Sequence, residues 1–195
     1  MSVQFKFLLK SVLVLCLLLA VHWTEGFSQG DQVRKSLKAS VSQTLGVDTD
    51  ITIIYSRPGV KGRTIWGDLV PYGMAPGNNA SKNKPFPWRA GANETTVFEV
   101  SKDVMIEGQK LPAGKYGLHM IPGKDKFVVI FNKDIAWGSF SYDEAQDALR
   151  VTVKPVAAPD EEWLCYGFED LAGTSATAFL HWEKLKVPFK ISIAE

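Results

Sequence analysis

Hydrophobic and polar residues alternate one by one along much of the chain after residue 38. The clearest run is 185–193, where Leu185, Val187 and Phe189 alternate with lysines and with Pro188. A period of two places the hydrophobic side chains on one face of a half-buried β-strand. Because proline is tolerated in sheets mainly at edges, this run is predicted to be an edge strand, whose lysines would discourage edge-to-edge association.

Other segments show the same alternation or a short β-branched, apolar run between turn residues. The run 127–131 is continuously apolar, which is typical of a central strand covered on both faces, and it follows a turn at 122–125. It is therefore predicted to form a hairpin with 114–121. The predicted strands are 51–56, 104–106, 109–111, 114–121, 127–131, 149–153, 164–170, 175–182 and 185–193.

Helical patterns are scarce. Only 32–42 and 142–148 are predicted to be helical, and neither has a long apolar stripe. Roughly nine short strands separated by turns predict an all-β fold, an antiparallel β-sandwich or jelly roll, with a barrel as the alternative architecture. Residues 70–87 are rich in Gly, Asn, Pro, Ser and Lys and lack either period, which predicts a long surface loop of the kind that often carries function.

The first 28 residues have the layout of a secretory signal. Lys6 and Lys10 precede an apolar run at 12–21, and small or polar residues follow to Ser28. The apolar run is shorter than the roughly twenty residues that a membrane-spanning helix needs. The sequence thus predicts export to the periplasm or the cell exterior, with cleavage after Ser28 or near Ala20 and no stable membrane insertion afterwards.

The rest of the chain is predicted to be a linker at 29–37 and one β-sandwich domain at 38–195, a usual domain size. The 195-residue chain has a formal charge of +1, and removal of the signal would bring it to about zero. This balance predicts no nucleic-acid partner, and no oligomeric state is indicated. Cys165 would be the one remaining cysteine, which excludes an intrachain disulfide.

Several blocks resemble an uncharacterised bacterial family, the domain of unknown function 2911. The blocks are YSRPGVKGR at 55–63 with LVPYG at 69–73, WRAGANET at 88–95, LPAGKY at 111–116 with IPG at 121–123, VIFN at 129–132 and WG at 137–138. They spread over most of the chain after the signal. The resemblance implies an exported bacterial protein, and it brings no established activity, substrate or catalytic residue.

Two of these blocks concentrate basic, aromatic and polar side chains. Arginines supply forked donors and tryptophan supplies a flat apolar face, a combination that holds sugars or carboxylated small molecules in clefts. The alternative is structural: Arg63 or Arg89 pairs with Glu94, and the aromatic rings pack. The predicted ligand-binding residues are Arg57, Lys61, Arg63, Tyr72, Trp88, Arg89, Asn93, Glu94 and His119.

His119 lies on the predicted strand 114–121, on the face of Gly117 and Ile121. It could act as a general base or a metal ligand, but a hydrogen-bonded, half-buried histidine is the favoured interpretation. The chain shows no metal-type spacing of His, Cys and carboxylates, so neither a metal site nor a cofactor is predicted. Cys165 is expected to be a small buried hydrophobic residue.

The leading functional prediction is a non-catalytic, exported β-sandwich that binds a small or sugar-like ligand or a partner surface. One alternative is an extracytoplasmic hydrolase, with Glu94 or Asp143 as the base and Arg89 stabilising developing negative charge. The carboxylates Asp143, Glu144 and Asp147 are nevertheless expected to be simply solvated. The other alternative is a structural envelope protein.

Overall fold

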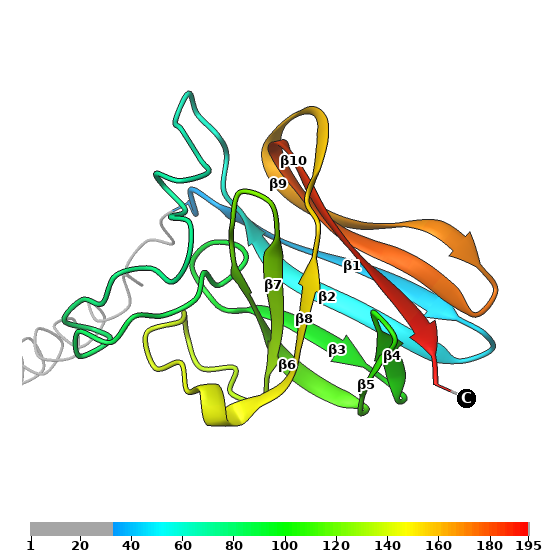
Figure 1. Cartoon of the computed structure of the whole chain (residues 1–195). Helices are drawn as coiled ribbons and strands as arrows, with labels where there is room; N and C mark the ends of the chain where they lie inside the picture. Colours follow the sequence, from blue (N-terminus) through cyan, green and yellow to red (C-terminus); the bar gives the residue numbers. More distant parts are fainter. Residues whose placement is uncertain (1–32, 195) are drawn as a thin grey trace, which may run out of the picture. The chain divides into compact units, whose positions relative to one another are not determined.

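The computed structural model describes residues 33–194, so the predicted signal at 1–28 lies outside the described residues. These residues form ten β-strands and no α-helix, which confirms the predicted all-β sandwich. Figure 1 shows the two groups of strands and the irregular segments that join them. Between residues 33 and 194, no helix has the length and apolar character needed to cross a bilayer.

Both sheets are antiparallel, and their order is β1-β2-β3-β6-β7-β8 in one and β5-β4-β10-β9 in the other. The strands of the first sheet are β1 (Leu37–Leu45), β2 (Thr49–Arg57), β3 (Thr96–Val100), β6 (Gly114–Ile121), β7 (Phe127–Asn132) and β8 (Asp147–Val153). Those of the second are β4 (Val104–Ile106), β5 (Gln109–Leu111), β9 (Val156–Ala172) and β10 (Ser175–Ile193).

The core lies between the inner faces of the two sheets. Phe98 on β3 and Phe131 on β7 meet edge to face at 4.9 Å between ring centroids, and Phe189 on β10 lies 6.3 Å from Phe98. All three rings are buried. Burial of every second side chain along β3 follows the pleat of a strand. The alternating pattern in the sequence therefore has its cause in this two-layer packing.

The two predicted helices are wrong. Residues 37–45 form β1, an edge strand that pairs with β2. The predicted helix 142–148 contains a single 3-10 turn at Glu144–Gln146, and β8 starts directly afterwards at Asp147. In residues 37–45, Leu37, Ala39 and Val41 alternate with polar residues. This period of two fits a strand paired with β2, not a helix.

The prediction that 185–193 is an edge strand is also wrong. It belongs to one long strand with 175–182, and β10 lies between β9 and β4 in the second sheet. The pairing with β9 ends at Lys186 and the pairing with β4 begins at Ile191. Pro188 falls in the gap between these two ladders, where its missing N–H breaks neither of them.

The predicted loop at 70–87 is irregular apart from two isolated β-bridges, Val70 with Trp66 and Ala75 with Phe86. A second irregular segment, 133–146, lies near it: the rings of Phe86 and Phe140 meet edge to face at 5.2 Å. Figure 1 shows both segments on the same side of the sandwich. The contact between Phe86 and Phe140 thus joins the two segments.

Candidate functional site

The turn that begins at Trp88 is fixed by the backbone. Trp88 and Met120 exchange two backbone hydrogen bonds of 2.9 and 2.8 Å, which attach the turn to β6. Ala90 is buried with a φ of +51°, and its carbonyl accepts hydrogen bonds from the hydroxyls of Thr96 (3.0 Å) and Tyr166 (2.8 Å). A β-carbon at Gly91 would lie 2.8 Å from the Thr96 hydroxyl. These contacts set the direction of Trp88 and of Arg89.

The segment after β2 is attached to the other sheet. The Leu164 N–H donates to the Pro58 carbonyl (3.0 Å), and the Val60 N–H donates to the Glu162 carbonyl (2.8 Å). Arg57 donates from Nε to the Leu164 carbonyl (2.9 Å) and from Nη2 to the carbonyl of Trp163 (3.2 Å). The guanidinium of Arg57 thus joins β2 to β9, and this residue does not line the cleft described next.

A cleft of ≈ 510 Å³ lies between these two segments, and we call it the Trp88 cleft. Its basic side chains are Lys35, Lys61, Arg63 and Arg89, and none of the described residues that line it is acidic. The full lining is Lys35, Ser36, Pro58, Gly59, Lys61, Arg63, Leu69, Val70, Trp88, Arg89, Gly91, Ala92, Asn93 and Trp182. Five of the nine predicted site residues therefore meet here: Lys61, Arg63, Trp88, Arg89 and Asn93.

Two tryptophan rings, Trp88 and Trp182, form part of the apolar lining of the cleft. Trp88 stacks on Trp182 with 6.1 Å between centroids and an interplanar angle of 18°. Trp66 meets both rings edge to face, at 5.7 and 6.0 Å. The buried indole N–H groups of Trp66 and Trp182 have no acceptor in the part of the chain that the structure describes. Unpaired buried donors are uncommon in folded proteins and cost about 1–3 kcal/mol each.

Arg89 sits between the cleft and the 133–146 loop. Its Nη1 donates to the Asn93 carbonyl (2.7 Å), and its guanidinium lies 5.0 Å from the ring centroid of Phe140 and 5.5 Å from that of Trp137. Burial lowers its pKa, which nonetheless leaves it charged at neutral pH because arginine titrates so high. The guanidinium is therefore held by a carbonyl and two rings, and no carboxylate within residues 33–194 forms an ion pair with it.

Among the described residues, Arg63 and Arg89 have partners other than the predicted Glu94. Arg63 donates instead to the carbonyls of Gly59 (2.6 Å) and Val60 (3.1 Å). Glu94 lines a separate pocket of ≈ 190 Å³, where it accepts a hydrogen bond from the Ser56 hydroxyl (3.1 Å). The structure thus separates Glu94 from the basic side chains of the Trp88 cleft.

Tyr72 and His119 also lie outside the cleft lining. Tyr72 is partly exposed, with its ring against Gly67. His119 is 3% exposed, so it is more deeply buried than the half-buried residue that the sequence predicted. Its Nδ1 lies 3.1 Å from the Ser139 hydroxyl, and its ring meets the Tyr142 ring edge to face at 5.5 Å. The 133–146 loop therefore covers His119 on the outer face of β6.

Burial lowers the pKa of His119 from its ordinary 6.5 to about 4. Burial is the largest cause of this lower pKa; Asp147 and Asp134 oppose it, and the charge of Arg89 contributes to it. A buried imidazole with this pKa is neutral at neutral pH. His119 consequently supports the loop as an uncharged hydrogen-bonding group.

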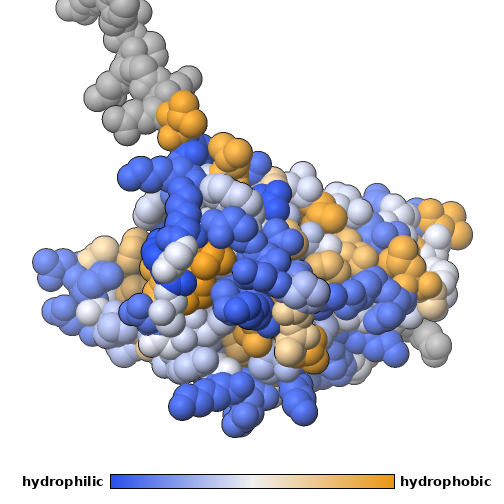
Figure 2. Space-filling view, turned by 90° about the horizontal axis from the view of Figure 1, so that it is seen from above, coloured by the Kyte–Doolittle hydropathy of each residue, from blue (hydrophilic) through white to orange (hydrophobic). Residues whose placement is uncertain are grey.

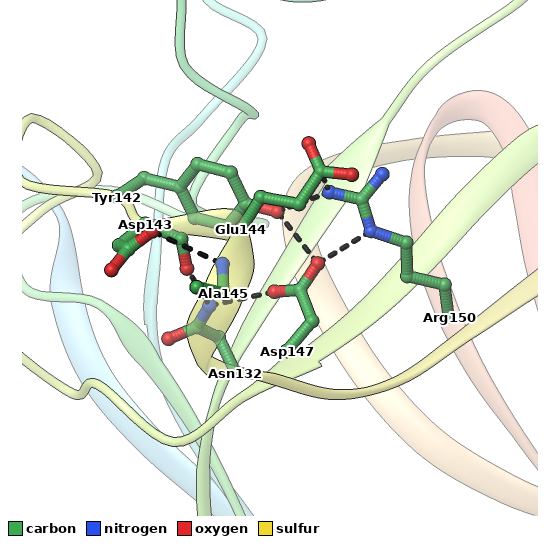
Figure 3. A network of polar contacts seen from close by, with 7 residues as sticks. All are labelled: Asn132, Tyr142, Asp143, Glu144, Ala145, Asp147 and Arg150. Atoms are coloured by element: carbon green, nitrogen blue, oxygen red, sulfur yellow. Dashed lines mark hydrogen bonds and ion pairs between the residues drawn. The ribbon is translucent and has the colours of Figure 1, made fainter.

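The end of the same loop is held by a polar network around Asp147 (Figure 3). Its carboxylate accepts hydrogen bonds from Asn132 Nδ2 (2.6 Å), the Tyr142 hydroxyl (2.8 Å) and Arg150 Nε (2.5 Å). Burial and the hydrogen bond to Asp147 raise the pKa of Tyr142 well above its ordinary value, which keeps the hydroxyl a donor. The prediction that these carboxylates are merely solvated is wrong for Asp147, whose side chain is 9% exposed.

The Asp147→Asn variant is expected to lose about 2 kcal/mol of unfolding free energy, because charge-assisted hydrogen bonds contribute about 1.5–3 kcal/mol. Urea denaturation at neutral pH would measure the loss. Glu144→Gln is the matched control, since Glu144 also pairs with Arg150 (3.2 Å) but is 74% exposed. It should change stability by less than about 0.5 kcal/mol. Equal losses in the two variants would contradict a special role for Asp147.

The comparisons with known proteins give one match. A family model described as "Protein of unknown function (DUF2911)" matches residues 36–191. No curated protein and no solved structure matches the chain. The matched range includes both segments that form the Trp88 cleft and the loop that covers His119.

Proposed function

Since the chain belongs to DUF2911, a family of proteins of unknown function, we propose a function from the geometry of its own residues. The protein binds a small anionic ligand with a ring-shaped apolar face in the Trp88 cleft, and carboxylated sugars are the ligand class. The observation that carries the proposal is the composition of the lining: four basic side chains and no carboxylate among the described lining residues.

The electrostatics of the cleft favour an anion. Close cations repel one another, and a carboxylate placed among them relieves that repulsion while it accepts charge-assisted hydrogen bonds. Arg89 has already lost part of its hydration, so a bound anion would gain more from it than from an exposed arginine. The forked guanidinium geometry also suits the two oxygens of a carboxylate.

The size and the aromatic surface of the cleft favour a small ring. A volume of ≈ 510 Å³ is within the roughly 300–1,000 Å³ of small-molecule sites. Trp88 is partly exposed there while its other surroundings are Trp182 and Trp66. Figure 2 shows hydrophobic groups scattered among hydrophilic residues on the face that it presents, without one continuous apolar patch.

The geometry gives no comparable support to hydrolysis in this cleft. Glu94 lines another pocket, and the Asp143 carboxylate accepts the Ala145 N–H (3.0 Å) as the cap of the 3-10 turn. Glycoside hydrolysis needs two carboxyl groups that face the same bond. We therefore propose binding without turnover. The proposal includes export, which the signal pattern of residues 1–28 supports, and N-terminal sequencing of protein recovered outside the cytoplasm checks it.

Calorimetric titration with glucuronate, galacturonate and their oligomers tests the proposal, with glucose as the neutral comparison. Lys61→Gln and Arg89→Gln should each weaken binding roughly tenfold or more, because a hydrogen bond to a charged group contributes about 1.5–3 kcal/mol. Lys124→Gln removes the same charge from an exposed residue outside the cleft lining and should leave affinity unchanged.

Three results would overturn the proposal. The first is the absence of binding of every acidic sugar to the folded protein. The second is an affinity that neither cleft variant changes. The third is equal binding of glucose and glucuronate, because the basic residues would then contribute nothing to the affinity.

A further inference from the structure

Three side chains of metal-ligand type come together on the β9–β10 hairpin. They are Glu161 and Cys165 from β9 and His181 from β10, each partly buried. One ligand atom from each residue lies within 4.8 Å of the other two. Cys165 is thus half-exposed and grouped with polar ligands, which differs from the buried hydrophobic residue that the sequence predicted.

The pleat and the register of the hairpin explain this meeting. Cys165 and His181 are direct cross-strand partners, so their side chains point to the same face. Leu164 and Leu180, their respective neighbours, point to the opposite face and are fully buried in the core. Glu161 lies four residues before Cys165, beyond a register shift in the ladder, and its carboxylate is nevertheless within 4.8 Å of the other two ligand atoms.

The ladder is irregular beside the cluster. Register shifts occur between His181 and Glu183 and again between Glu183 and Leu185. Glu183 has a positive φ of 55°. Such bulges bend a strand and redirect side chains, and they are frequent next to functional sites. Here the bulge follows His181 directly.

A separate hydrogen bond fixes the tautomer of His181 in a form that can bind a metal. Its Nε2 lies 2.9 Å from the Pro159 carbonyl, which can only accept a hydrogen bond, so Nε2 carries the proton. Nδ1 then keeps its lone pair. Histidines that bind metals almost always donate their other ring N–H to a carbonyl or carboxylate in this way, which fixes the tautomer and the ring orientation.

The nearby cations already have partners. Lys186 forms an ion pair of 2.7 Å with Glu169, and the guanidinium of Arg57 donates to backbone carbonyls of β9. A divalent ion at the cluster would be attracted by the Glu161 carboxylate. It would also stabilise the thiolate form of Cys165, as metal ions do with coordinating thiols.

We propose that Glu161, Cys165 and His181 form a zinc site with three protein ligands and an open fourth position. A mixed oxygen, sulfur and nitrogen set suits Zn²⁺, and three protein ligands with a free position are typical of zinc sites that bind water or a further ligand. Zinc bonds of roughly 2.0–2.3 Å place tetrahedral ligands about 3.5 Å apart, which side-chain rotation reaches from the observed grouping. This site is on the outer face of β10, whereas Trp182 of the Trp88 cleft is on the inner face, so the two proposals are independent.

The test is a titration of the full chain with Zn²⁺ against a chromophoric chelator, followed by Co²⁺ substitution. The wild-type chain should bind one Zn²⁺, and the Co²⁺ form should show a thiolate-to-cobalt charge-transfer band. Cys165→Ala and His181→Gln should each weaken Zn²⁺ binding by more than about a hundredfold, since loss of an outer hydrogen-bond partner alone costs 10–100-fold. Cys165→Ser, which is nearly isosteric, should remove the charge-transfer band even if Co²⁺ still binds.

His119→Gln is the matched histidine control, because His119 lies on β6 outside the cluster. It should leave zinc affinity at the wild-type value. Substoichiometric binding to the wild-type chain would overturn the proposal. So would equal affinities in the wild type, Cys165→Ser and His181→Gln, with folding of each variant checked by circular dichroism.

Discussion

The Phe98→Ala variant is expected to lose about 3–5 kcal/mol of unfolding free energy, a large part of the roughly 5–15 kcal/mol that stabilises a typical domain. Phe98 is fully buried where the two sheets meet, and it contacts Phe131 of its own sheet and Phe189 of the other. Removal of the ring loses its transfer free energy and leaves a cavity between layers that cannot close completely. Guanidinium denaturation followed by tryptophan fluorescence measures the change.

Phe179→Ala is the matched control for this prediction. Phe179 lies on the outer face of β10, partly exposed, with Lys186 4.5 Å from its ring centroid. Its loss should cost less than half as much, since less apolar area returns to water. A Phe98 variant as stable as the Phe179 variant would show that the sheets do not pack through this ring.

The second large effect is a loss of stability in mild acid that depends on His119. Its pKa falls from 6.5 to about 4 on folding, so between these values the unfolded chain binds a proton that the folded chain does not. The neutral, buried His119 therefore makes its full contribution to the unfolding free energy above pH 6.5, and this contribution is lost as the pH falls towards 4. At about 1.4 kcal/mol per pH unit, the full loss is about 3 kcal/mol.

The His119→Gln variant isolates this contribution. Glutamine can still hydrogen-bond to the Ser139 hydroxyl but does not titrate. Denaturation measured at several pH values between 7 and 4 should give a shallower acid decline for the variant than for the wild type. Parallel pH profiles of the two proteins would contradict the assignment, because carboxylates elsewhere would then explain the whole decline.

Period-two alternation predicted most of the sheet strands correctly because it records local burial. The wrong predictions concern the position of a strand within its sheet, which depends on the strands that pair with it. Nothing local distinguishes an edge from an interior position for 185–193, since two separate ladders use different halves of β10. At β1 the weak burial of an edge strand leaves few apolar residues, and the sequence therefore predicts a helix there instead of a strand.

For the candidate site too, the sequence predicts the residues of a local block but not the contacts between distant segments. The blocks at 55–63 and 88–95 could be joined from the sequence, because both combine basic residues with turn-forming glycines. The separation of Glu94 from Arg89 could not be predicted, since the local sequence does not specify the backbone of the turn between them, in which Ala90 and Asn93 both have a positive φ (51° and 59°). The meeting of Cys165 with His181 was missed because it depends on cross-strand register, which sequence spacing does not record.

The 133–146 loop contacts both the Trp88 cleft and the buried His119. One part, Trp137 and Phe140, flanks Arg89 in the Trp88 cleft, and another, Ser139 and Tyr142, encloses His119. Thermodynamic reciprocity then applies: if an imidazolium displaces the loop and so weakens retention of the proposed anion, the anion must disfavour protonation by the same factor. Under that coupling, a chain carrying its ligand would tolerate acid better than an empty one.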